Sequence, residues 1–254
     1  GAMRPVRALV VPLLVLLAWQ LAASLGLASP YLLPAPATVL HTAGDMLESG
    51  LLVRHTAASL GRVARGFSIS VAAGCALAAL LTALPRLEKA LDPTLSFMRM
   101  TPPLATIPLL ILWFGIGEAT QLAIIILASF FPVYLNARAG FARLDASYRE
   151  LAASLSLSRL DYARYFAGPA ALPSIVTGVR LSFGYSWRAL IAAELIAAGS
   201  GLGYMISDAE QMQRVDVVMV GIFAIGLVGW ALDALFRRVV AGVAGRRFPE
   251  VVEG

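Results

Sequence analysis

A long apolar run between Leu172 and Ala198 contains the residues of this chain that are best suited to chemistry. Its polar members include Ser182, Tyr185, Ser186, Arg188 and Glu194. On a helix, Tyr185 and Arg188 share one face, while the two serines and Glu194 fall at steps of four residues on another. A charge near the centre of a membrane-spanning helix costs at least ~2.5–3.5 kcal/mol, so it must face water, a counter-charge or a partner.

We interpret these five residues as candidates for a polar path across a membrane, in which Arg188 attracts an anion. The alternative for Arg188 is a structural ion pair between two helices, and the residue types fit both readings. Catalysis is not expected, because no paired carboxylates, His cluster or nucleophile with a base converge in the apolar runs. A metal site is not expected either, since Cys75 is the single cysteine and the two histidines are isolated.

A second polar segment, residues 144–168, lies between two apolar runs. Its apolar stripe consists of Leu144, Tyr148, Leu151 and Leu155. This spacing predicts an amphipathic helix, which Ser156-Leu157-Ser158 should break. Ser158 and Asp161 form a capping-box pattern for a second short helix, and Gly168-Pro169 should end it. Two short helices with a bend would form a rigid knob that a soluble partner could grip. The alternative is a pair of helices that only lie on a membrane surface.

The composition predicts an all-α membrane protein with about six spanning helices. Of 254 residues, 59% are hydrophobic and 14% charged, and the mean hydropathy is +0.80, which is too apolar for an ordinary soluble domain. Runs near the ~20 residues that a span needs are Val6–Leu27, Gly66–Leu84, Pro102–Gly117, Thr120–Asn136, Leu172–Ala198 and Val217–Phe236. We expect one transmembrane domain over residues 1–254, with Gly1-Ala2-Met3 as a tag remnant.

The basic residues predict the orientation of these spans. With six spans both termini lie on one side, and placing them inside assigns 14 of the 20 Lys and Arg residues to the cytoplasm. The residues 144–168 are then cytoplasmic, and 28–65 are external. The pI of about 9.8 therefore reflects membrane orientation, and nucleic-acid binding is not expected.

Residues 150–173 resemble the cytoplasmic coupling motif of permease subunits in binding-protein-dependent ABC importers, which reads roughly E-A-A-x-x-x-G and then L-P. Glu150, Ala152 and Leu172-Pro173 match this motif, whereas Leu151 replaces its second Ala and Ser156 its Gly. The stretch Thr101–Gly117 resembles permeases of the sulfonate, taurine and nitrate group. By this resemblance, the residues expected to contact an ATPase are Glu150, Leu151, Ala152, Ala153, Leu155, Ser156, Ser158, Arg159 and Asp161.

The resemblance implies a type I importer permease fold in a bacterial inner membrane. It also implies a homodimer or a pair of similar subunits, two cytoplasmic ATPases that bind ATP and Mg, and an extracytoplasmic solute-binding protein. Gly199-Ser200-Gly201-Leu202-Gly203-Tyr204 lacks the Lys-Ser/Thr ending of a phosphate-binding loop, so a flexible turn is expected there. No other segment of the sequence supplies such a loop, so if ATP drives this protein, the ATPase is expected to be a separate chain. The expected substrate is a small anion such as a sulfonate, taurine or nitrate. Alternatives are another small solute, such as a thiamine precursor, or an ion-driven carrier.

Overall fold

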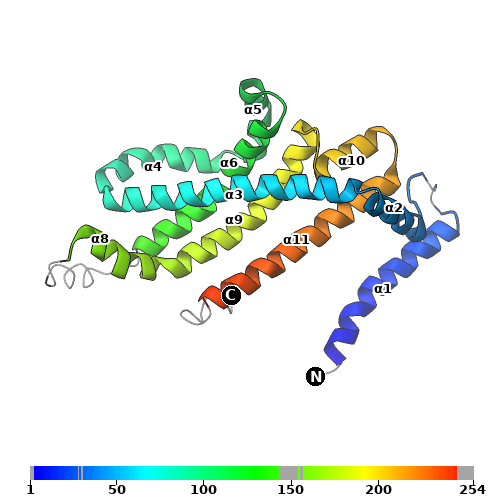
Figure 1. Ribbon diagram of the computed structural model, residues 1–254, viewed down its shortest axis with the longest axis horizontal. Coiled ribbons are helices and arrows are strands. Elements are labelled where there is room, and N and C mark those ends of the chain that lie inside the picture. The colour runs from blue at the N-terminus through cyan, green and yellow to red at the C-terminus, as the bar shows by residue number, and fades with distance from the viewer. Residues whose placement is uncertain (1–2, 28, 30, 143–153, 155–156, 245–254) are drawn as a thin grey trace. The chain divides into compact units, whose positions relative to one another are not determined.

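The computed structural model describes residues 3–27, 29, 31–142, 154 and 157–244, and within these ranges the regular structure is helical (Figure 1). Four helices are long and apolar enough to cross a membrane: α3 (Leu51–Ala83), α6 (Glu118–Ala142), α9 (Gly168–Ala197) and α11 (Val215–Ala244). They coincide with four of the six expected spans. The apolar part of α1 (Met3–Ser24), Val10–Ser24, is shorter.

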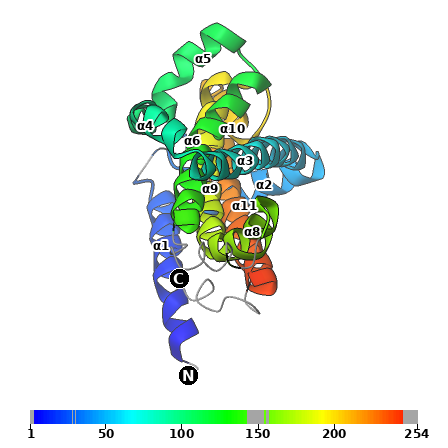
Figure 2. The same ribbon diagram turned by 90° about the vertical axis from the view of Figure 1, so that its left-hand side faces the viewer.

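The remaining expected span, Pro102–Gly117, is not one straight helix. The chain instead forms α4 (Pro85–Met100), the 3₁₀ turn η1 (Pro103–Thr106) and the eight-residue α5 (Ile107–Phe114). The helices on either side of this break meet at a bend of 89°, and only together are they long and apolar enough to form a broken membrane span. Pro102 and Pro103 supply no backbone N–H across the bend, and Gly115, at φ 75°, ends α5. Figure 2 shows α5 turning away from α4.

The chain divides into two compact units. The first comprises residues 1–59 and 194–227, and it includes α1, α2 (Pro36–Glu48) and α10 (Leu202–Gln211). The helix α2 is amphipathic, with Val39, Thr42 and Met46 buried along one side. The indole Nε1 of Trp19 donates to Pro34 O at 3.1 Å, and its ring stacks on Phe223. The Thr42 hydroxyl donates to Asp216 at 2.9 Å. These contacts tie α1 and α2 to the start of α11.

The second unit comprises residues 60–193 and 228–254, and close helix packing defines it. A Cβ added at Gly66 would lie 2.7 Å from Ile125 Cγ2, and one at Gly178 would lie 2.9 Å from Pro132 O. Glycine therefore lets α3 and α9 approach α6. Leu91 and Leu95 of α4 pack on the α3 core around Leu81, so α3 and α4 lie side by side (Figure 1).

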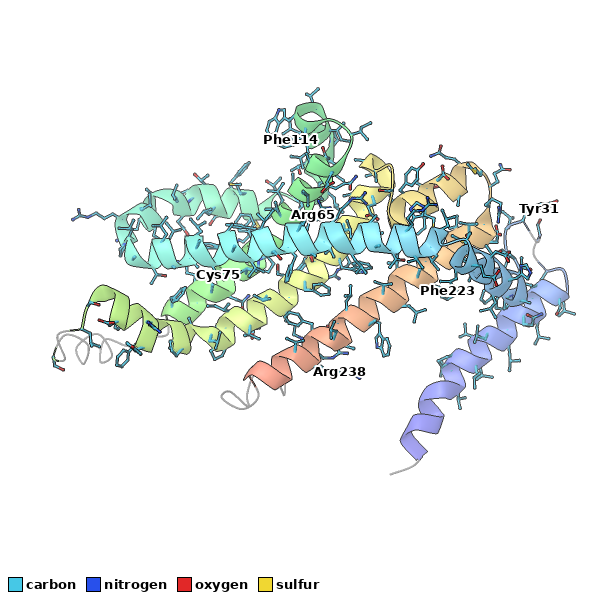
Figure 3. The ribbon with its side chains drawn as sticks, in the orientation of Figure 1. Tyr31, Arg65, Cys75, Phe114, Phe223 and Arg238 are labelled. Atoms are coloured by element: carbon cyan, nitrogen blue, oxygen red, sulfur yellow. The ribbon has the colours of Figure 1, made fainter. Side chains whose placement is uncertain are left out.

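Ion pairs between helices add to this packing in the second unit. Arg65 of α3, labelled in Figure 3, pairs with Glu118, the first residue of α6. Arg138, toward the other end of α6, pairs with Glu88 of α4.

The exposed end of α5, marked by Phe114 in Figure 3, is apolar.

Candidate functional site

Of the segment that resembles the coupling motif, the structure describes Ser154 and the residues from Leu157 onward. Glu150, Leu151, Ala152, Ala153, Leu155 and Ser156 lie outside the described residues, as does the side chain of Arg159. The predicted cap is present at the start of α8 (Arg159–Tyr162). Ser158 Oγ accepts from the Asp161 N–H at 3.1 Å and donates to the Asp161 carboxylate at 2.6 Å. This arrangement satisfies one N–H of the first turn.

The predicted end of that helix at Gly168-Pro169 is wrong. The chain continues from α8 through a π-helical turn, η2 (Ala163–Ala167), directly into α9. Pro169 is the second residue of α9 and has no backbone N–H to donate to the preceding turn, yet the helix continues through it. Tyr162 stacks on Phe166 across the turn, with ring centroids 6.1 Å apart. The segment is thus a helical extension of a membrane span.

The side of α9 that carries Arg188 is exposed, whereas α6 and α11 cover other sides of this helix. Near Ser182, α6 contacts α9, because the Ser182 hydroxyl donates to Ser129 O. The end of α11 covers the opposite flank, where Phe183 stacks on Phe236 and Trp187 lies against Gly229. Neither helix covers Arg188.

The structure brings together Tyr185 and Arg188, as the helical spacing predicts. Tyr185 is 50% exposed. The Arg188 guanidinium lies 5.1 Å from the centroid of its ring, and Arg188 Nε donates to Gly184 O at 3.0 Å. Among the described residues Arg188 has no carboxylate partner. An arginine over an aromatic face keeps its charge while shielding one side from solvent, so this pair offers a cation at the surface of the span.

The other three path candidates are buried. Ser182 and Ser186 donate to backbone carbonyls, the second to Phe183 O at 2.7 Å. Glu194 is 1% exposed. The structure therefore places Tyr185 and Arg188 on one exposed face and turns Ser182, Ser186 and Glu194 inward.

Glu194 is the centre of a buried polar cluster in the first unit. Ser59 Oγ donates to its two carboxylate oxygens at 2.9 and 2.8 Å, and the Gly203 N–H donates to Oε2 at 3.0 Å. Ser59 Oγ in turn accepts from the Leu202 N–H at 2.9 Å. The cluster joins α3, the end of α9 and the start of α10, and its donors reduce the cost of burying the carboxylate.

This cluster corrects the expectation of a flexible turn at residues 199–204. The N–H groups of Gly201, Leu202 and Gly203 all bond to side chains, those of His55, Ser59 and Glu194 respectively. Gly201 has φ 113°, and a Cβ there would collide with the Glu194 carboxylate, so glycine is required. Sequence reasoning missed His55 and Ser59, although their spacing of four residues on a helix places them on one face.

Comparison with known proteins agrees with this architecture. Residues 66–247 match the family of binding-protein-dependent transport system inner membrane components. The taurine transport system permease protein TauC of Escherichia coli is 38% identical over 87% of this chain and 84% of its own. The bicarbonate transport system permease protein CmpB of Synechocystis is 34% identical over 86% and 81%. The nitrate import permease protein NrtB of Leptolyngbya laminosa is 36% identical over 76% and 68%.

The spans define a helical membrane protein, and the match to the family model identifies its class as a transport permease. The chain belongs to the family of binding-protein-dependent transport system inner membrane components, which are ABC importer permeases.

Proposed function

We propose that this chain is the membrane-spanning subunit of an ATP-driven importer for a small oxyanion. The observation that supports it most directly is the Arg188–Tyr185 pair on the exposed face of α9. A charged side chain facing lipid would be costly, so this face must meet water, substrate or another protein in the membrane. Within a family of permeases, a water-filled path between two subunits meets that requirement.

The substrate class follows from the charge of this face and from the relatives. The names of the relatives TauC, CmpB and NrtB refer to taurine, bicarbonate and nitrate, respectively. Taurine has a sulfonate group, and the other two are anions, so all three present negatively charged oxygens. A guanidinium presents planar N–H donors that suit such oxygens. The permease would therefore pass a sulfonate, taurine, nitrate or a similar oxyanion.

Coupling to ATP would use the segment that leads into α9. Two cytoplasmic ATPases would bind ATP and Mg, while an extracytoplasmic solute-binding protein would deliver substrate to a pair of permease subunits. Contact residues for the ATPases would come from Glu150–Asp161, and α8 with η2 would pass their displacement to α9. Binding protein and ATP must favour different states of the permease, because a ligand of equal affinity for both shifts nothing. Both termini would be cytoplasmic.

Uptake by proteoliposomes tests this proposal. Vesicles would hold the permease with its partner ATPase, with ATP trapped inside and substrate-loaded binding protein outside. Uptake should require ATP and both partners, and Glu150→Lys should abolish it while the permease still inserts. Uptake that persists without ATPase and follows an imposed ion gradient would instead identify an ion-driven carrier. Normal substrate-stimulated ATP hydrolysis by Glu150→Lys would remove the coupling assignment.

A further inference from the structure

A recess in the first unit contains a cation that none of the contacts above uses. It is lined by Arg54 and His55 at the start of α3, and by Gly199 and Ser200 in the loop before α10. Arg54 is exposed, and among the described residues it has no carboxylate partner. The recess therefore places one positive charge beside a short stretch of backbone and two polar side chains.

The wall of this recess is fixed by the buried cluster beneath it. The Gly201 N–H donates to His55 Nδ1 at 3.1 Å, and the next two N–H groups are held by Ser59 and Glu194. His55 also stacks on Tyr204, with ring centroids 6.1 Å apart. Because these contacts within the subunit hold the wall in place, a partner would lose little free energy in ordering it.

The hydrogen bond to His55 also defines the charge of the recess. Since Nδ1 accepts the Gly201 N–H, it carries no proton, and the neutral ring has its proton on Nε2. Arg54 is then the cation of the recess. A guanidinium presents planar N–H donors that suit a carboxylate.

We infer that this recess receives an acidic side chain of the extracytoplasmic binding protein. The inference rests on the proposed function, which places residues 28–65 and the loop before α10 outside the cell. A protein partner fits better than a free anion, because an exposed arginine holds a lone anion weakly in water. A carboxylate on a protein surface gains from the contacts around it, and the charge pair accelerates encounter.

Binding of the purified binding protein to the permease–ATPase complex in lipid nanodiscs tests this inference. Arg54→Ala should raise the Kd about tenfold at low salt, and Arg54→Glu should raise it further. The wild-type Kd should rise with ionic strength more steeply than that of Arg54→Ala. Arg65→Ala is the matched control: it removes an arginine from the same helix whose charge is taken by Glu118, so its Kd should stay at the wild-type value.

Each outcome bears on the inference. Basal ATPase activity reports assembly, and Arg54→Gln, which keeps a polar side chain, replaces Arg54→Ala if that variant assembles poorly. An unchanged Kd in assembled Arg54 variants overturns the inference and leaves the importer proposal intact. An unchanged Kd with a raised KM for uptake assigns the recess to free substrate and also overturns it. Failure of the wild-type complex to bind any binding protein rejects both proposals.

Discussion

The Ser59 hydroxyl donates to both carboxylate oxygens of Glu194, at 2.9 and 2.8 Å, although the two residues are 135 positions apart in the chain. Both side chains are buried. Their contact joins α3 to the end of α9, and through the Leu202 and Gly203 N–H groups it holds the start of α10. Glu194 is therefore a positioning residue in this arrangement.

Removal of this contact should destabilise the permease. Ser59→Ala leaves the carboxylate and the Leu202 N–H each short of a partner, at a cost of about 1–3 kcal/mol. Glu194→Gln should cost less than Glu194→Ala, because its amide still accepts a hydrogen bond. The Tm of each purified variant measures the order of these three losses of stability. Ser49→Ala, which removes an exposed hydroxyl, should leave Tm unchanged, and an equal Tm for Ser59→Ala would contradict the role.

Helix packing predicts opposite effects for two glycines. A Cβ at Gly178 would lie 2.6 Å from Asn136 Cβ, whereas one at Gly226 meets nothing within 4 Å. Gly178→Ala should therefore cost about 1–3 kcal/mol through overpacking. Gly226→Ala should stabilise α11 by roughly 0.5–1 kcal/mol, since alanine favours a helix interior. Tm values of the two variants check the signs, and a Gly178→Ala permease as stable as wild type would refute the tight α6–α9 contact.

The cap of α8 should matter for coupling. Ser158→Ala removes the hydroxyl that accepts from the Asp161 N–H, so the first turn should fray. Substrate-stimulated ATP hydrolysis should fall, while the permease still inserts. Ser158→Thr keeps the hydroxyl and should restore coupling. If alanine and threonine variants couple equally well, the cap has no part in transmission.

Substitution of Arg188 separates the two readings of that residue. For a path residue, Arg188→Ala should lower uptake with assembly and binding-protein docking intact, and Arg188→Lys should retain part of the activity, because it keeps the charge without the planar fork. Tyr185→Leu, which removes the ring beneath the guanidinium, should have a smaller effect. An ion pair with another subunit predicts loss of assembly instead. A well-assembled Arg188→Ala complex with wild-type uptake would exclude both roles.

Thiol labelling in intact cells tests the orientation. In a Cys75→Ser background, Gln211→Cys should react with an impermeant reagent, and Gly242→Cys should be protected until the cells are permeabilised. Both positions are exposed in the subunit, so access depends on the side of the membrane. The reverse pattern would invert the topology and place residues 144–168 outside the cell.

Regular features of the fold could be predicted because they are repeated along the sequence. Four spans follow from runs of apolar residues. The placement of Arg188 and Tyr185 on one face follows from helical spacing. The Ser158 cap follows from a local pattern, since its partner is only three residues away. In each case the information lies within one helix.

Features that depend on distant or competing contacts could not be predicted. Ser59 and Glu194 meet only because α3 and α9 pack together. The glycine-rich sequence of residues 199–204 does not indicate these partners, so it predicts a flexible turn. The break before α5 could not be placed from the sequence, because proline occurs both at helix starts and at bends. The end expected at Gly168-Pro169 failed because a π turn carries the helix through to Pro169.

The π turn also bears on the orientation of α8. A π turn holds one residue more than an α turn, so the five residues of η2 advance the side chains about as far around the axis as four residues of an α-helix. Deleting one residue between Ala163 and Ala167, with closure to an α turn, would therefore leave α8 at nearly its present angle to α9. Deleting one residue inside α9, where the helix has no extra residue, would instead rotate α8 by roughly 100° relative to the rest of α9. The length of this connection can thus change by one residue at η2 while the orientation of the cytoplasmic segment is kept.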